Sequence, residues 1–127
     1  MWKVLEIKPN EPDALNHIGY TWAEEGRNLE KALEMIRQAV NQEPENEAFL
    51  DSLAWVLFKL GRGAEALIPM EKSIQLSDPP DPTLFDHLGD IRQSLGNREA
   101  AEEAWRKAIE LKPDPAIERK LKSPEKP

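Results

Sequence analysis

Residues 108–113 read AIELKP, and residues 4–9 read VLEIKP, almost the same letters near the opposite end of the chain. Two related segments lie between them, AVNQEP at 39–44 and SIQLSD at 73–78. The four segments begin at residues 4, 39, 73 and 108, so their spacings are 35, 34 and 35 residues. A fixed period of this length predicts a solenoid of stacked helical repeats.

Each repeat resolves into two helical stretches, the first of which ends at a glycine. Gly26, Gly61 and Gly96 lie 35 residues apart, and glycine readily takes the positive φ that ends a helix. Apolar residues recur at three- and four-residue steps, as from Leu15 to Ile18. Short connections favour antiparallel neighbours. The sequence therefore predicts an all-α solenoid of antiparallel helix pairs, with helices over residues 13–25, 29–42, 46–60, 63–77, 82–95 and 98–112.

Two local features refine this prediction. Small residues share one register in the first helices and another in the second helices, which predicts close helix approach at these positions: Gly19, Ala54 and Gly89, then Ala32, Ala66 and Ala101. Pro69 lies inside a predicted helix, where it removes a backbone hydrogen bond. We expect a kink there, on the outer face of the array, or a helix that begins near residue 68.

The composition narrows the functional classes. A net charge of -7 argues against non-specific attraction to nucleic-acid phosphate or anionic lipid, which requires a basic face. The chain has no cysteine, so disulfides and thiolate chemistry are excluded, although this does not assign a compartment. No apolar run approaches the ~20 residues that cross a bilayer.

The repeats resemble the tetratricopeptide repeat (TPR), which has a Leu-Gly-aromatic pattern in its first helix, a turn glycine and alanines in its second helix. The matching segments are LNHIGYTW, LDSLAWVL and FDHLGDIR, each followed by the turn glycine. Ala54 replaces the usual glycine, and Met70 and Arg92 stand where aromatic residues are usual. The resemblance implies a right-handed α-solenoid that serves as a protein–protein interaction scaffold or adaptor. It places three repeats at residues 12–46, 47–81 and 82–115.

One stretch, Phe49–Gly61, is similar to repeats of bacterial outer-membrane adaptor lipoproteins. This likeness leaves the compartment open. The alternatives are the bacterial cytoplasm or, if the full-length protein carries a lipoprotein signal, the periplasm with attachment to the outer membrane.

In TPR proteins the first helix of each repeat lines a concave groove, and this register gives a candidate partner-binding face. We expect a protein or extended peptide with an apolar anchor against Tyr20 and Trp55 and a basic or amide-rich flank beside the acidic residues. The alternative is that Trp55 and Phe58 pack half-buried against the next repeat and that the acidic residues are ordinary solvated ones. The candidate residues are Asn16, His17, Tyr20, Glu24, Asp51, Ser52, Trp55, Phe58, Lys59, Asp86, His87, Asp90 and Gln93.

The best-known groove chemistry of the family is a clamp of Lys, Arg and Asn around a peptide's C-terminal carboxylate. The corresponding positions here hold no Lys or Arg, which argues against binding of a chaperone tail; they are Asn16, Tyr20, Ser52, Thr83 and His87.

The sequence gives no sign of catalysis or of a cofactor. His17 and His87 share a register two repeats apart, so helix spacing puts them roughly 20 Å from each other, too far for one metal ion or proton relay. Asp86 and Asp90 share a helix face, but no fourth metal ligand accompanies them and His87. We therefore expect neither an enzyme nor a metal site.

The ends of the chain complete the sequence-based expectations. Residues 1–9 resemble the C-terminal half of a preceding, truncated repeat. Residues 116–122 are expected to form a short capping helix, and residues 123–127 are expected to be a disordered tail. A repeat array needs polar caps, and the N-terminal end lacks one. The alternative function is therefore a structural or oligomerisation segment of a larger TPR protein that self-associates through this uncapped end.

Overall fold

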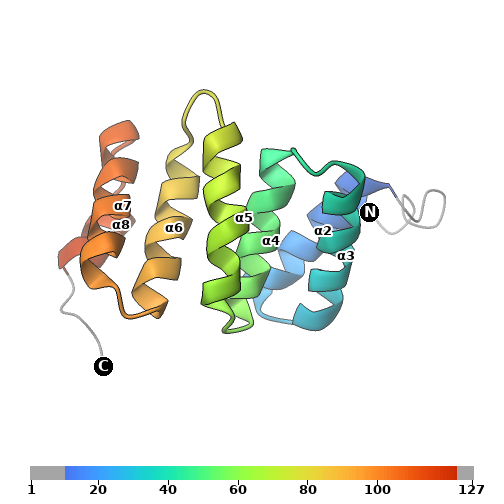
Figure 1. Cartoon of the computed structure of the whole chain (residues 1–127). Helices are drawn as coiled ribbons and strands as arrows, with labels where there is room; N and C mark the ends of the chain where they lie inside the picture. Colours follow the sequence, from blue (N-terminus) through green and yellow to red (C-terminus); the bar gives the residue numbers. More distant parts are fainter. Residues whose placement is uncertain (1–10, 123–127) are drawn as a thin grey trace.

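The computed structural model describes residues 11–122 as a row of helices joined by short loops (Figure 1). No strand occurs in this part of the chain. The predictions for residues 1–9 and 123–127, including self-association through the N-terminal end, fall outside the described residues. The helices are α2 (Pro12–Glu25), α3 (Leu29–Gln42), α4 (Glu47–Lys59), α5 (Gly63–Leu76), α6 (Pro82–Ser94), α7 (Arg98–Leu111) and α8 (Pro115–Lys122).

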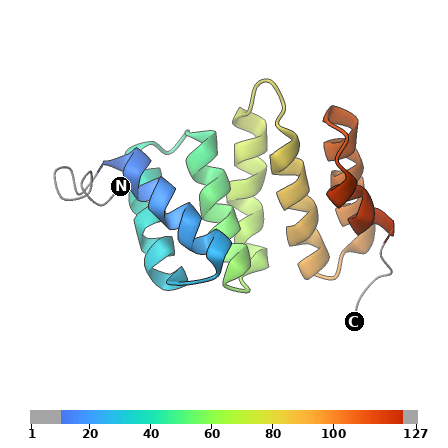
Figure 2. The same cartoon turned by 180° about the vertical axis from the view of Figure 1, so that it is seen from behind.

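The helices form two rows. The first-helix row, α2, α4, α6 and α8, faces the viewer in Figure 2, and α3, α5 and α7 form the second-helix row behind it. Helix α2 packs on α4, and α4 on α6, whereas neighbours in the second-helix row make no comparable contacts within residues 11–122. The array therefore curves with the first-helix row on its inner side, and the predicted all-α solenoid is confirmed.

The helices begin and end close to where the sequence signals predicted. Gly26 takes a φ of 71°, and its backbone N–H donates to the carbonyl groups of Trp22 and Ala23 at the end of α2. The equivalent glycines after α4 and α6 also have positive φ. At the N-termini, Asn46 Oδ1 accepts from the backbone N–H of Phe49 at 3.1 Å, as an N-cap side chain does. These local bonds fix the reversals that make each pair antiparallel.

Small residues allow the two helices of a pair to approach closely. The equivalent alanines, such as Ala32, Ala54 and Ala66, are completely buried. A Cβ atom on Gly19 would lie 2.6 Å from Ile36 Cγ1, and one on Gly89 would overlap the indole ring of Trp105. The shared small-residue register is therefore a packing requirement.

Pro69 differs from its predicted setting. Helix α5 begins at Gly63 and runs through Pro69, so the alternative of a helix that begins near residue 68 is wrong. Pro69 is buried rather than on the outer face, because α5 packs against both α4 and α6. In the same helix, the Ser73 hydroxyl donates to the Glu47 carbonyl oxygen at 2.7 Å and fastens α5 to the start of α4.

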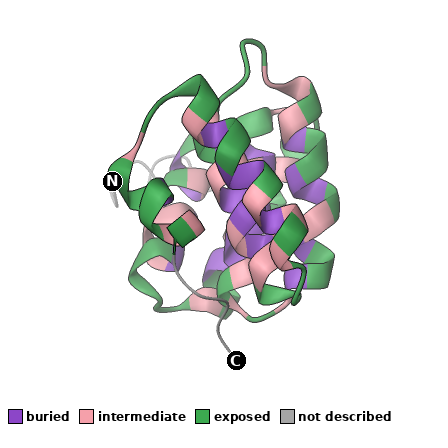
Figure 3. Ribbon diagram, turned by 90° about the vertical axis from the view of Figure 1, so that its left-hand side faces the viewer, coloured by how far each residue is buried: buried purple, intermediate pink, exposed green. Residues whose placement is uncertain are grey.

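The C-terminal end is closed by α8. Figure 3 views the array from this end and shows buried positions concentrated between helices, with exposed positions on their outer sides. Ile117 of α8 is buried in a small cluster with Ala101, Trp105 and Ala108 of α7. Helix α8 thus occupies the position that the first helix of a further repeat would take.

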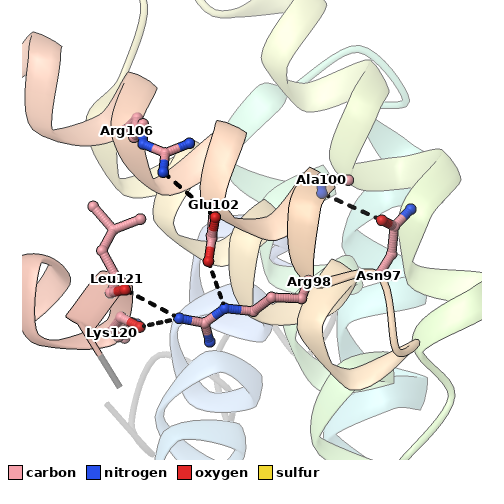
Figure 4. Close-up of polar contacts among 7 residues, drawn as sticks. All are labelled: Asn97, Arg98, Ala100, Glu102, Arg106, Lys120 and Leu121. Carbon is pink, nitrogen blue, oxygen red and sulfur yellow. Dashed lines mark hydrogen bonds and ion pairs between the residues drawn. The ribbon is translucent and has the colours of Figure 1, made fainter. Parts of the chain in front are cut away.

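Arg98 at the start of α7 holds α8 in place (Figure 4). Its Nη2 atom donates to the carbonyl oxygens of Lys120 at 2.8 Å and Leu121 at 3.2 Å, at the C-terminal end of α8. Its Nε atom donates to Glu102 Oε2 at 2.9 Å. A partly buried guanidinium therefore pairs with carbonyl groups that the short helix cannot satisfy internally.

Candidate partner-binding face

The sequence-predicted site residues all lie on α2, α4 and α6 in the first-helix row. The surface formed by these predicted site residues is called the inner face. His17, Glu24 and Lys59 are exposed, whereas Asn16, Tyr20, Phe58 and Gln93 are partly buried. The remaining residues form two connected groups, one around Trp55 and one around Asp86 and Asp90.

An ion pair crosses from the second repeat to the third. His87 Nδ1 lies 2.8 Å from Asp51 Oδ1, and both side chains are largely shielded from solvent. Burial alone would lower the pKa of His87, but the hydrogen bond and the charge of Asp51, with Asp86 and Asp90 nearby, raise it above its usual range. The inner face is thus cross-linked between repeats by an imidazole–carboxylate contact, which is an ion pair when His87 is protonated.

The same imidazole stacks on Trp55. Their ring centroids are 4.0 Å apart with an interplanar angle of 20°. Trp55 also stacks on Phe58 with centroids 4.9 Å apart, and Lys59 Nζ lies 5.3 Å from the Trp55 ring. His87 and Trp55 thus stack across the α4–α6 interface, and Phe58 extends the stack along α4.

This packing corrects the predicted role of Trp55. The sequence register left two alternatives, an exposed anchor for a peptide or packing against the next repeat, and the structure shows the second, because Trp55 is only 7% exposed and stacks on His87. Ser52 and His87 are buried as well, at 3% and 6% exposed. The physical reason is that α4 lies at the centre of the array and has neighbours on almost every side. A helix that is apolar nearly all round is expected to be buried, and α4 carries that signal in its sequence.

Tyr20 keeps part of its ring exposed. Burial, a hydrogen bond to Glu24 and the negative charges of Glu24 and Asp51 raise the pKa of the Tyr20 hydroxyl far above its usual value. The phenol therefore stays neutral and lies, partly exposed, beside the acidic groups of Glu24 and Asp51. This part of the inner face keeps the aromatic–acidic combination that the sequence predicted.

Lys120 is the site residue that sequence reasoning missed. It reaches from α8 to α6, where its Nζ lies 2.7 Å from Asp86 Oδ1 and 2.9 Å from Asp90 Oδ1. Burial raises the pKa of Asp90 even though Lys120 opposes the rise. The available signal was the basic residue in the predicted capping helix, but its partner could be known only once α8 was docked.

The described residues contain neither a metal-binding cluster nor a membrane-spanning helix. In the described part of the chain, no three His, Cys, Asp or Glu side chains are arranged to hold a metal ion. Over residues 11–122, no helix combines the length and apolar character needed to cross a bilayer.

The architecture is that of a helical-repeat protein, with antiparallel pairs, a shared small-residue register and a closing helix. Residues 83–115 match the family model of the tetratricopeptide repeat. The TPR repeat-containing protein PA4667 of Pseudomonas aeruginosa is 32% identical over 87 residues, which are 68% of this chain and 14% of that protein's length. The chain is a TPR protein, and the family is generally a non-enzymatic protein-interaction fold.

Solved structures share the fold at lower sequence identity. The first TPR domain of the human RPAP3 protein superposes with a TM-score of 0.79 at 19% identity, over 90% of this chain and 89% of that one. The first TPR of Spaghetti (RPAP3), bound to the HSP90 peptide SRMEEVD, gives a TM-score of 0.79 at 18% identity, over 88% of each chain.

Proposed function

We propose that this chain is an interaction module that binds an extended segment of a partner protein along its inner face. The observation that carries the proposal is the combination of acidic side chains from all three repeats with two partly buried aromatic rings. The carboxylates are Glu24, Asp51, which is paired with His87, and Asp86 and Asp90, which are paired with Lys120; the rings are Tyr20 and Phe58. Such a face suits a partner with an apolar anchor and a basic flank.

The anchor position is assigned to Tyr20 and Phe58 instead of the predicted Trp55. Trp55 is committed to its stack with His87, so a partner could reach it only by opening the α4–α6 interface. Tyr20 and Phe58 each keep one side against the core and the other side accessible. Aromatic residues supported in this way are favourable contacts for a peptide side chain.

The rigidity of the face supports extended binding. The Asp51–His87 ion pair ties α4 to α6, and α2 packs directly on α4. A preformed surface spares a bound segment part of the ordering cost. A peptide laid across the row would therefore meet groups held in fixed positions, with Glu24 as the exposed carboxylate among them.

A peptide array tests this proposal. The peptides share one central Leu or Phe and differ only in flanks of Lys or Arg, Gln, or Glu. We expect the basic flanks to be preferred and binding to weaken as salt rises. Tyr20→Ala and Glu24→Lys should each weaken binding about fivefold, or about 1 kcal/mol.

Glu34→Lys is the matched control, because Glu34 is an exposed residue of α3 in the second-helix row. It makes the same charge change on the opposite side of the array. Equal losses in Glu24→Lys and Glu34→Lys would show that only net charge matters, and the inner-face assignment would fail.

A further inference from the structure

The contacts of Lys120 describe a small binding site for an ammonium group. Its Nζ atom lies 2.7 Å from Asp86 Oδ1, 2.9 Å from Asp90 Oδ1 and 3.1 Å from Asp90 Oδ2. An ammonium group has three N–H donors, and three carboxylate oxygens are within hydrogen-bonding distance. The Trp105 ring centroid lies 6.0 Å from the same atom and adds a cation–π contact.

The site is partly enclosed and belongs to the inner face. The Asp90 side chain is 16% exposed and that of Asp86 24%, so neither is an ordinary solvated surface group. They lie one turn apart on α6 and point toward the same cation. Without the cation, these two shielded carboxyl groups would lie close together with no opposite charge between them, and burial already raises the pKa of Asp90.

We propose that Asp86 and Asp90 form a subsite for a primary ammonium group of the partner, and that Lys120 occupies this subsite in the free chain as an internal competitor. This proposal rests on the proposed function of the inner face. It identifies a partner amine as the recognised chemistry and α8 as the element that limits access.

The attachment of α8 is suited to competition. The helix spans only Pro115–Lys122, and its buried apolar contact is made by Ile117. A helix of this length is not stable by itself, so its order depends on docking. Because Lys120 is tethered, its effective concentration at the subsite is in the millimolar range. A partner that also binds elsewhere on the inner face can bring its own ammonium group to the subsite at a higher effective concentration.

The test removes the competitor and supplies the amine from solution. Lys120→Ala in the 127-residue chain is compared with Lys122→Ala, a matched substitution at an exposed position of the same helix. The probes are Nα-acetyl-lysine amide, alanine amide and tetramethylammonium, all at millimolar concentrations. The first carries a side-chain ammonium, the second an α-ammonium, and the third has the charge but no N–H donors.

We expect the two primary ammonium probes, and not tetramethylammonium, to raise the thermal midpoint of Lys120→Ala. The larger of the two effects identifies a lysine side chain or a chain N-terminus as the source. Lys122→Ala and the unsubstituted chain should not respond. Equal effects of all three probes, or equal responses of the two variants, would overturn the proposal.

A second measurement uses the unsubstituted chain and does not depend on how Lys120→Ala folds. The ammonium protons of Lys120 should exchange with solvent more slowly than those of Lys122, and a double substitution Asp86→Asn and Asp90→Asn should remove the difference. Equal exchange in the unsubstituted chain would show that the carboxylates do not hold the ammonium.

Competition itself is measured with the basic-flank peptides of the array. Lys120→Ala should bind them about tenfold more tightly, because the competent site is no longer occupied internally. Unchanged or weaker binding overturns the competitor role. If no peptide binds either chain while the amine probes still stabilise Lys120→Ala, the proposed function fails and the ammonium subsite stands.

Discussion

Gly89 determines how closely α6 approaches α7. A methyl group at this position would overlap the Trp105 indole, and Trp105 is itself buried with only 2% of its surface exposed. We expect Gly89→Ala to lower the free energy of unfolding by about 1–3 kcal/mol, the usual cost of overpacking a core. Urea denaturation measures the loss.

Gly63→Ala is the control for this substitution. Its new methyl group would meet mainly the Ser94 hydroxyl at 2.8 Å, at the end of an exposed side chain that can rotate away. We expect a much smaller change there. Equal losses at the two positions would mean that backbone freedom, and not the Trp105 contact, explains the effect.

His87 makes stability depend on pH. Although burial opposes protonation, Asp51 and its acidic neighbours raise the folded-state pKa of His87 above the unfolded value of about 6.5. A group whose pKa is higher in the folded state stabilises that state fully at pH values below its unfolded pKa. This stabilisation is lost as the pH rises through the folded-state pKa. We expect the urea midpoint to fall over that interval above pH 6.5.

The source of this pH dependence can be isolated. Asp51→Asn removes the main partner charge and should shrink the fall, whereas His17→Gln changes the exposed histidine of α2 and should leave it in place. A midpoint that falls equally in Asp51→Asn would assign the effect to other groups.

At the scale of the element, Arg98 supplies the hydrogen bonds that hold the C-terminal end of α8. Arg98→Ala removes both bonds to the last carbonyl groups of α8 and the ion pair with Glu102. We expect α8 to lose amide-exchange protection, since each lost hydrogen bond to a charged donor costs about 1.5–3 kcal/mol. Helices α2–α5 should keep their protection. Hydrogen exchange read helix by helix measures this.

Arg106→Ala provides the comparison on the same helix. Arg106 pairs with the same glutamate at 3.4 Å, but its side chain is 67% exposed and it does not supply the α8 bonds. We expect little change in α8 protection. A loss as large as in Arg98→Ala would show that the charge of Glu102, and not the carbonyl contacts, holds the helix.

At the scale of the molecule, stability is distributed between neighbouring repeats. Ile36 lies in the large central cluster, and Ile117 lies in the small cluster at the C-terminal end. Each Ile→Ala change should cost about 2–5 kcal/mol locally. In a solenoid we expect Ile36→Ala to lower protection across α2–α5 and Ile117→Ala to lower it mainly in α7 and α8. A uniform loss from either would indicate one fully cooperative unit.

The fold was largely predictable because its signals are local and repeated. Residues 29–42 were predicted as a helix and form α3 with the same bounds, because an apolar stripe and a preceding turn glycine define it. The site was less predictable, because its geometry depends on docking between helices. Trp55 is buried by its contact with His87 a full repeat away, and Lys120 reaches Asp86 only through the placement of α8.

The unequal contacts of the two rows also have a mechanical consequence. The first helices α2, α4 and α6 pack on one another, whereas the second helices are separated. We therefore expect resistance to bending to be greatest along the inner side of the array. Its easiest deformation is a change of curvature about the first-helix row, which alters the gaps between second helices and leaves the inner packing intact. A ligand on the inner face would lie beside the axis of this motion, where the distances between repeats change least, so it could keep its contacts with all three repeats while the molecule bends.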